Sequence, residues 1–220
     1  MSSVLDRPPI IRGDHVFLRP SERADLPLFV RWFNDAEVLR NLAMHAPMST
    51  AGEAAWFDRM LAAQGSTDYH FVICLLTDGR PIGTTGLHGI DLHNGSADFG
   101  IAIGEKAEWS KGFGTDAVCA ICDFGFGELR LERISLHVYA GNDRARRSYE
   151  KAGFTHEATL RRAHFSRGEY HDAHVMSMLR GEWSALAAGV PPQSTSSALL
   201  GPNDTECPTC TSLHLVRGLS

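Results

Sequence analysis

The stretch Trp109-Ser110-Lys111-Gly112-Phe113-Gly114-Thr115-Asp116-Ala117 decides the fold that we predict for this chain. It follows an apolar run, Phe99 to Ile103, and opens a segment whose apolar residues recur with helical periodicity. Two glycines one residue apart let the backbone turn tightly and approach a ligand closely. The first amides of a helix have no partner inside it, and its N-terminus carries partial positive charge. The stretch therefore predicts a binding site for a phosphate or pyrophosphate group.

Three kinds of glycine-rich site share this local chemistry. A P-loop needs a lysine directly after its last glycine, but Gly114 is followed by Thr115. A dinucleotide site needs the pattern G-x-G-x-x-G/A, which Gly112, Gly114 and Ala117 match. However, the first glycine of that pattern should end a strand. Here Glu105 to Lys111 separate the apolar run from Gly112, so this match is weak. The third possibility is a coenzyme A site, and the segment that follows favours it.

That segment combines a strand, a break and a second helix. Apolar and polar residues alternate from Arg133 to Tyr139, as expected of a strand with one face in the core. Asn142 or Asp143 can cap a helix after the break, and Gly153 is a typical residue to end that helix.

Two motifs together resemble the GNAT acyltransferase superfamily. The residues Asn142 to Phe154 are similar to its "N…A…YEK.GF" segment, and Trp109 to Ala117 resemble its pyrophosphate loop. The resemblance extends over about residues 10 to 184, and its pattern is closest to the ribosomal-protein N-terminal (RimJ/RimL-type) acetyltransferases. It implies an α+β fold with a mixed, mostly antiparallel central sheet flanked by helices, whose splayed central strands hold the cofactor.

The remaining sequence pattern agrees with an α+β sheet built from hairpins. Asp78-Gly79 and Asn94-Gly95 are hairpin signals, and Thr50-x-x-Glu53 has the form of a capping box at the start of a helix. The other predicted strands are His15–Arg19, Phe71–Leu76, Pro81–Leu87, Ala97–Ile103, Thr155–Ala163 and His174–Leu179, and the other early helices are Ser21–Phe33 and Ala36–Leu42.

The periodic pattern stops near residue 185. We therefore expect one acetyltransferase domain at residues 10–184 and a disordered tail at residues 185–220. In that tail, Cys207, Cys210 and His214 have zinc-ligand spacing but lack a fourth ligand nearby, so no metal is expected.

Composition narrows the class of protein. The 220 residues carry a net charge of −5, which argues against a nucleic-acid partner. Met1 to Pro9 do not form a signal sequence, and no apolar run approaches the ~20 residues of a membrane helix. Five cysteines, an odd number, suggest the reducing cytoplasm. A monomer and a homodimer both remain open.

The resemblance assigns the cofactor, acetyl-CoA, to three segments. The strand with Ile101, Ala102 and Ile103 would pair with pantetheine, and a backbone amide near Ile103 would face the thioester carbonyl. The pyrophosphate would bind at the loop, and the second helix would add further contacts. The loop residues are Lys111, Gly112, Phe113, Gly114 and Thr115, and the helix residues are Asn142, Arg144 and Lys151.

Tyr149 matches the superfamily tyrosine near the sulfur and is the candidate general acid. Its ordinary pKa of ~10 lies above the ~8.5 of a thiol, so it is not ionised at neutral pH and still has a proton to donate to the departing thiolate. Asp98 and His88 are alternative general bases, and a water chain could replace both. Cys119 and Cys122 lie well inside the predicted helix and are interpreted as buried core thiols, which favours direct transfer over an acyl-cysteine.

We therefore expect an acetyl-CoA-dependent N-acetyltransferase acting on a primary amine. The alternatives are a catalytically silent acyl-CoA-binding module and a dinucleotide-dependent oxidoreductase. A protein N-terminus, a polyamine, an aminoglycoside and an amino sugar all remain open as acceptors, and Ala36–Met60 with Leu160–Asp172 would form the specificity surface.

Overall fold

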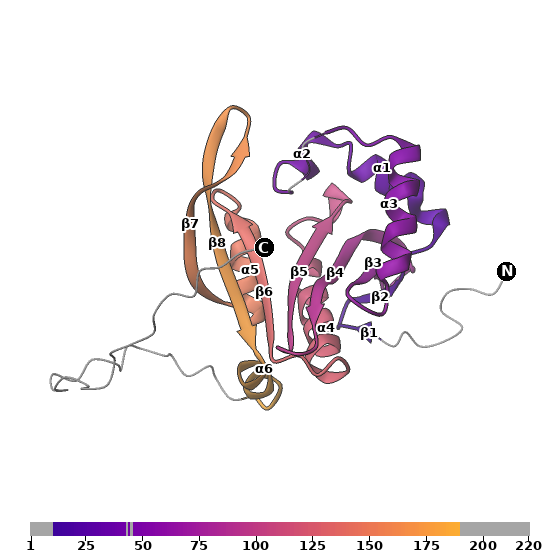
Figure 1. The fold of residues 1–220 in the computed structure, drawn as a ribbon. Helices are drawn as coiled ribbons and strands as arrows, with labels where there is room; N and C mark the ends of the chain where they lie inside the picture. Colours follow the sequence, from indigo (N-terminus) through magenta and orange to yellow (C-terminus); the bar gives the residue numbers. More distant parts are fainter. Residues whose placement is uncertain (1–10, 43, 45, 190–220) are drawn as a thin grey trace, which may run out of the picture.

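In the described part of the chain, eight strands form one mixed sheet in the order β1-β2-β3-β4-β5-β6-β8-β7 (Figure 1). The computed structural model describes residues 11–42, 44 and 46–189 of the chain. The strands are β1 (Ile11–Arg12), β2 (Val16–Pro20), β3 (Tyr69–Leu75), β4 (Pro81–Asp91), β5 (Ser96–Ile103), β6 (Arg133–Tyr139), β7 (Thr155–Ser166) and β8 (Glu169–Leu179). Neighbouring strands are antiparallel except β5 and β6, so the predicted fold class is confirmed.

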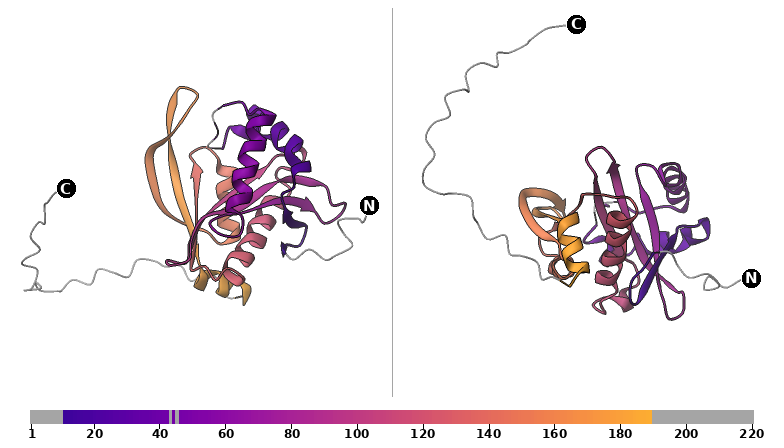
Figure 2. Two further views of the ribbon diagram at one scale, coloured as in Figure 1. Left: turned by 45° about the vertical axis from the view of Figure 1, so that its right-hand side comes forward. Right: turned by 90° about the horizontal axis from the view of Figure 1, so that it is seen from below.

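Helices cover both faces of this sheet (Figures 1 and 2). They are α1 (Leu26–Trp32), α2 (Ala36–Leu39), α3 (Thr50–Ala63), α4 (Phe113–Gly127), α5 (Asp143–Ala152) and α6 (Arg180–Ala187), with 3-10 turns η2 (Arg23–Asp25) and η3 (Lys106–Glu108). Because strand side chains alternate between faces, the sheet contributes to two cores. One core lies under α4 and α5 around Ile121 and Tyr149, and the other lies under α1 and α3 around Phe29 and Phe57.

Several predicted boundaries shift. The early helical segments are shorter, since α1 begins at Leu26 after η2 and α2 ends at Leu39. Strands β7 and β8 instead extend further than predicted, to Ser166 and from Glu169, because they pair with each other almost to the turn. The disordered tail was predicted to begin at residue 185, but α6 runs through Ala187, and its Trp183 packs on Phe126. The predicted tail residues 190–220, with Cys207, Cys210 and His214, lie outside the described residues.

The capping box predicted at Thr50 and Glu53 is wrong. Ser49 is the N-cap of α3, and its hydroxyl accepts a hydrogen bond from the Gly52 amide at 3.0 Å. The Glu53 side chain is instead completely buried. Within the described part of the chain, no helix has the length and apolar character to cross a bilayer.

Candidate active site

The parallel strands β5 and β6 separate part of the way along the sheet. They pair only from Ser96 to Asp98 on β5 and from Arg133 to Ser135 on β6. Beyond these residues a cavity of about 300 Å³ opens between them, with Phe99–Ile103 on one wall and His137–Tyr139 on the other. We call it the splay cavity. The predicted splaying of the central strands is thus present, and it leaves backbone groups of β5 without a strand partner on this side.

Nine of the residues predicted to bind cofactor or to act in catalysis line the splay cavity. They are Ile101, Ala102, Ile103, Gly112, Gly114, Thr115, Asn142, Arg144 and Tyr149. These residues come from β5, the start of α4 and α5 with its N-cap Asn142, so the two sequence motifs meet at one place.

The glycine loop has the backbone geometry of an anion site. Gly112 is the N-cap of α4 with a φ of 91°, a left-handed conformation that favours glycine, and Ser110 also has a positive φ of 63°. No side chain caps this helix, and its first internal hydrogen bond runs from the Asp116 amide to the Gly112 carbonyl at 3.0 Å. The amides that precede Asp116 in the helix are therefore directed to the N-terminal end, where an anion can accept from them.

Asn142 has the capping role that the sequence left open. Its side-chain oxygen accepts from the Ala145 amide at 3.3 Å at the start of α5, while the residue also lines the splay cavity.

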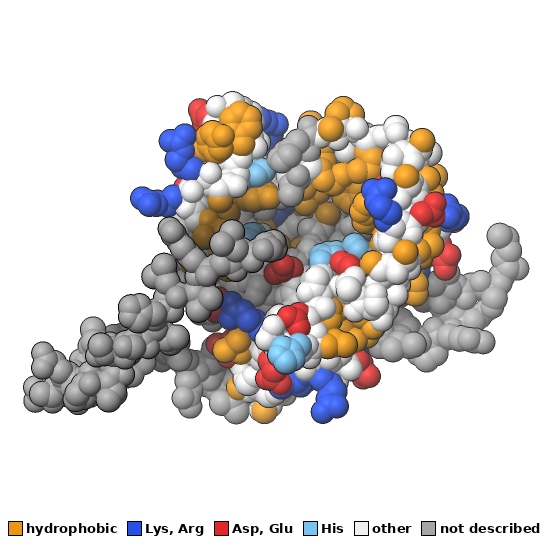
Figure 3. All heavy atoms as spheres, viewed as in Figure 1, with side chains coloured by type: hydrophobic (Ala, Val, Ile, Leu, Met, Phe, Trp, Pro, Cys, Tyr) orange, Lys and Arg blue, Asp and Glu red, His pale blue; other side chains and the backbone are white. Residues whose placement is uncertain are grey.

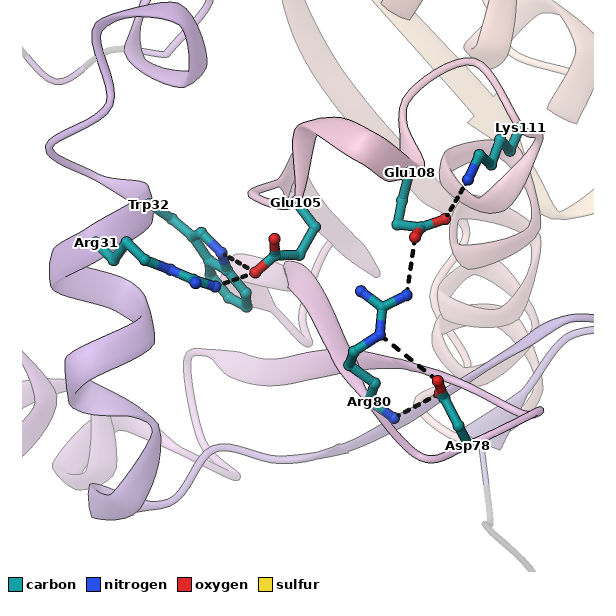
Figure 4. Close-up of polar contacts among 7 residues, drawn as sticks. All are labelled: Arg31, Trp32, Asp78, Arg80, Glu105, Glu108 and Lys111. Atoms are coloured by element: carbon teal, nitrogen blue, oxygen red, sulfur yellow. Dashed lines mark hydrogen bonds and ion pairs between the residues drawn. The ribbon is translucent and has the colours of Figure 1, made fainter.

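Three predicted cofactor residues lie elsewhere. Lys111 is not a lining residue of the splay cavity, because its ammonium bonds the Glu108 carboxylate at 3.0 Å (Figure 4). The ring of Phe113 instead makes an edge contact with the His15 ring at 6.4 Å, so only its backbone amide is available to the loop site. Lys151 is exposed near the end of α5 and does not line the splay cavity.

A network of hydrogen bonds and ion pairs holds the segment that precedes the glycine loop (Figure 4). Glu108 accepts from Arg80 at 2.8 Å as well as from Lys111, and the hydrogen bond from Arg80 is the main cause that lowers the pKa of Glu108. Glu105 accepts from the Trp32 indole at 2.9 Å and from Arg31. Both carboxylates belong to the segment between β5 and α4, so these bonds position the glycine loop relative to α1 and the β3–β4 turn.

Trp109 is a lining residue that the sequence predictions did not include. Its indole nitrogen donates to the Ile103 carbonyl at 2.8 Å, and the Arg144 guanidinium lies 4.0 Å from its ring centroid. This stack joins the loop to α5, and both residues line the splay cavity. The Ile103 carbonyl is therefore already occupied, which leaves the preceding residues of β5 for a ligand.

Tyr149 lies on α5 in the wall of the splay cavity and is almost fully buried. Its ring makes an edge contact with Phe99 of β5 at 6.0 Å between centroids. Burial raises the pKa of Tyr149 to about 12, so the phenol keeps its proton at neutral pH.

A second cavity of about 650 Å³ lies under the N-terminal helices, and we call it the helix-side cavity. Its walls come from α1, α3, β3 and β4, and it shares Leu42 and the β5 residues Gly100–Ala102 with the splay cavity. Figure 3 shows this face of the molecule hollowed between the β7–β8 hairpin and the N-terminal helices, with hydrophobic side chains prominent in the hollow. The two cavities meet along one strand.

His88 belongs to the helix-side cavity. It lies within β4 rather than at its end, and its Nδ1 is 3.3 Å from the Asp68 carboxylate. A Cβ added to Gly100 would lie 3.2 Å from His88 Nε2, so the ring rests on the shared strand β5. Sequence reasoning missed Asp68, because it lies twenty residues before His88, in the turn between α3 and β3.

His70 completes a group of titratable side chains in this cavity. Its ring centroid is 4.6 Å from that of His88, and burial, followed by the proximity of His88, lowers the pKa of His70 to about 4. Burial alone would raise the pKa of Asp68, but hydrogen bonds from Thr67 and His88 lower it below its ordinary value. Asp68, His70 and His88 offer one ligand atom each within 4.8 Å of one another, a group that could also hold a metal ion.

Two other predictions are not supported by the geometry. Asp98 is exposed on β5 opposite His88 in the strand register, and it lines neither cavity. Cys122 is buried as predicted, but the prediction that Cys119 is buried is wrong, because this residue lies on the exposed side of α4. Neither cysteine lines either cavity.

Comparisons with known proteins agree with this geometry. The acetyltransferase (GNAT) domain model matches residues 15–155, and the chain belongs to this family. It is 30% identical over 171 residues to spermidine N(1)-acetyltransferase of Escherichia coli K12, covering 77% of this chain and 89% of that protein. It is also 34% identical over 109 residues to the putative ribosomal N-acetyltransferase YdaF of Bacillus subtilis, covering 50% of this chain and 59% of that protein.

A solved structure is similar in fold as well as in sequence. Spermidine N-acetyltransferase of Vibrio cholerae, crystallised with CoA and spermine, superposes with a TM-score of 0.71 at 26% identity, covering 77% of this chain and 98% of that chain. Together, the family match and these relatives identify the protein as an N-acetyltransferase. The dinucleotide-dependent oxidoreductase and the silent binding module are therefore set aside.

Proposed function

We propose that the protein transfers an acetyl group directly from acetyl-CoA to a primary amine, and that the acceptor is a polyamine. The observation that carries this proposal is the shared wall of the two cavities, the β5 residues Gly100–Ala102. A thioester held along β5 in the splay cavity would present its carbonyl carbon to an amine that enters from the helix-side cavity. Holding the two reactants in this way replaces a bimolecular encounter.

The cofactor would be held by backbone groups and by one stacked cation. The amides at the start of α4 would donate to the pyrophosphate, the free edge of β5 would pair with pantetheine, and Arg144 on the Trp109 ring would lie beside the phosphates. This arrangement is supported by the residues that line the splay cavity, which reaches from the loop to Tyr149.

Proton transfer would be divided between the two cavities. His88, oriented by Asp68, would take the proton that the attacking amine loses as its nitrogen bonds to the carbonyl carbon. As the carbon–sulfur bond breaks, Tyr149 would donate its proton to the thiolate, since its pKa of about 12 keeps the phenol protonated at neutral pH, and the phenolate would then regain a proton from solvent. The products would be an acetylated amine and free CoA.

The choice of a polyamine rests on the relatives and on the chemistry of the helix-side cavity. Spermidine acetyltransferases match most of their own length to this chain. Among the described residues that line the cavity, acidic side chains are present and lysine and arginine are absent, which suits a cationic acceptor. A protein N-terminus is the second candidate, supported by the match to the putative ribosomal enzyme YdaF.

Two measurements test the proposal. Acetyl-CoA should raise the thermal stability, by about 2.7 kcal/mol at a hundred times its dissociation constant, and Gly112→Val should remove that shift because a branched residue is strained at a φ of 91°. Free thiol should then be released from acetyl-CoA when spermidine is present. Release with a ribosomal-type peptide but not with spermidine would replace the polyamine by a protein N-terminus, and no release with any amine would refute the proposed reaction.

A further inference from the structure

Glu53 has a buried carboxyl group without a partner. The residue is 0% exposed, and neither carboxyl oxygen has a hydrogen-bond partner among the residues that the structure describes. Buried polar side chains in folded proteins are almost always hydrogen-bonded, and an exception demands an explanation. Ser49 already caps α3, so the helix terminus does not need Glu53. Glu53 is therefore held in a costly position for which the structure of the free protein gives no compensation.

The position of Glu53 indicates which group could offset the cost of burying its carboxyl group. It lines the helix-side cavity together with Trp56, one helical turn further along α3. The same cavity reaches the shared β5 wall and His88. A ligand in this cavity can therefore approach the proposed reaction centre, and it reaches the buried Glu53 carboxyl when neighbouring side chains shift on binding.

A cation is the group that Glu53 lacks. Burial raises the pKa of the Glu53 carboxyl, and a positive charge beside it would restore the ionised form. Lysine and arginine are absent among the described residues lining the cavity, so the cation must come from outside this group of side chains. An alkylammonium suits the surroundings, because Trp56, Phe29 and Phe33 provide aromatic and apolar surface for its carbon chain.

We propose that Glu53 binds the non-reacting ammonium group of the acceptor and thereby selects amines that carry at least two amino groups. This inference rests on the proposed function, since it assumes that the reacting amine lies at the shared β5 wall. The reacting amine must lose its proton, whereas the second amine stays protonated and forms charge-assisted hydrogen bonds with Glu53. Glu53 is a specificity-determining residue in this arrangement and takes no part in proton transfer.

The test is the binding of spermidine to the native protein and to Glu53→Gln, measured by calorimetry. Glutamine keeps the size of the side chain and removes its charge. We expect spermidine to bind about 10- to 150-fold more weakly, the range for loss of a hydrogen bond to a charged group. Acetyl-CoA should bind both proteins equally. Asp58→Asn removes an exposed carboxylate from the same helix and should leave the spermidine affinity unchanged.

Turnover adds a second readout. The ratio of kcat/KM for 1,4-diaminobutane to that for butylamine should fall at least about tenfold in Glu53→Gln, because butylamine has no second ammonium. Equal spermidine affinity in the two proteins would overturn the proposal, as would a parallel loss of acetyl-CoA binding, which would make Glu53 a structural residue. Zinc chloride binding that depends on Glu53, with spermidine binding unchanged, would overturn it in favour of a metal ligand.

These results separate this inference from the proposed function. Spermidine binding that depends on Glu53, without thiol release from acetyl-CoA, would support the role of Glu53 in binding and refute the reaction. Thiol release with spermidine that Glu53→Gln leaves unchanged, together with unchanged affinity, would support the reaction and refute the role of Glu53.

Discussion

The two cavities on either side of β5 are built in different ways. The splay cavity is formed by two short motifs and presents backbone groups: the free edge of β5 and the amides at the start of α4. The helix-side cavity presents side chains from segments far apart in the chain, among them Glu53 on α3, His70 on β3 and His88 on β4. A site made of backbone groups can be encoded by a local sequence pattern. A site made of side chains from distant segments forms only when the whole chain has folded. Cofactor binding should therefore tolerate side-chain changes that acceptor chemistry does not.

The largest effect is expected for Tyr149→Phe, a side-chain change in the wall of the splay cavity. It should lower kcat by about 10²- to 10⁴-fold, the usual contribution of general acid–base catalysis. The ring keeps its packing on Phe99, so the dissociation constant of acetyl-CoA should stay nearly unchanged. Stopped-flow or pH-dependent turnover under conditions where chemistry limits the rate would check this. Turnover equal to that of the native enzyme would leave Tyr149 as a packing residue.

His88→Ala tests the other side of β5. Loss of the proposed base should lower kcat by about 10²-fold at neutral pH. Activity should recover partly as pH rises, because more of the amine is then neutral without help from the enzyme. Asp68→Asn should have a smaller effect in the same direction, since it removes only the partner of His88 Nδ1. A rate loss in His88→Ala that is the same at every pH would argue against the base role.

Gly100→Ala tests the shared wall itself. The new methyl group would lie 3.2 Å from His88 Nε2, so the ring must shift by a few tenths of an ångström. We expect kcat to fall about tenfold, because small displacements of a reacting group are costly. Gly181→Ala in α6, where a Cβ meets nothing within 4 Å, is the matched control. If both variants have native rates, His88 does not act from its position against Gly100 of β5.

The smallest effect is expected for Lys111→Ala. The Lys111 ammonium is paired with Glu108 and half-exposed, and exposed pairs contribute at most about 1 kcal/mol. The dissociation constant of acetyl-CoA should rise less than about fivefold. Arg144→Ala should weaken binding more, by about tenfold, because Arg144 lines the splay cavity and stacks on Trp109. The reverse order of the two effects would show that Lys111 turns from Glu108 to the phosphates on binding.

Much of the fold could be predicted because its signals are local. The hairpins at Asp78-Gly79 and Asn94-Gly95 and the helix that ends at Gly153 follow from turn residues and periodicity, and all three are present. The errors occur where distant segments compete with local preferences. Glu53 has the spacing of a capping residue. Because α3 packs against the sheet, however, the Glu53 side chain is buried on the inner face of the helix.

Asp116 shows the same limit within the glycine loop. No role was predicted for this residue from the sequence, but its carboxylate accepts hydrogen bonds from the amides of Asp14, His15 and Val16 at 2.8 to 2.9 Å. These partners are about a hundred residues away in the chain, so no spacing rule could reveal them. Asp116 ties the start of α4 to the N-terminal strands and thereby holds the loop in place.

The sequence by itself determined the class of fold, the glycine loop and the two motifs that meet at the splay cavity, because backbone geometry at glycines and helix ends depends on neighbouring residues. Only the tertiary structure decided which side chains share a cavity. It joined His88 to Asp68 and His70, left Asp98 outside both cavities, engaged Lys111 with Glu108 and buried Glu53 beside Trp56. These relations depend on strand register and on how helices pack over the sheet, and packing is set by contacts between residues far apart in the chain.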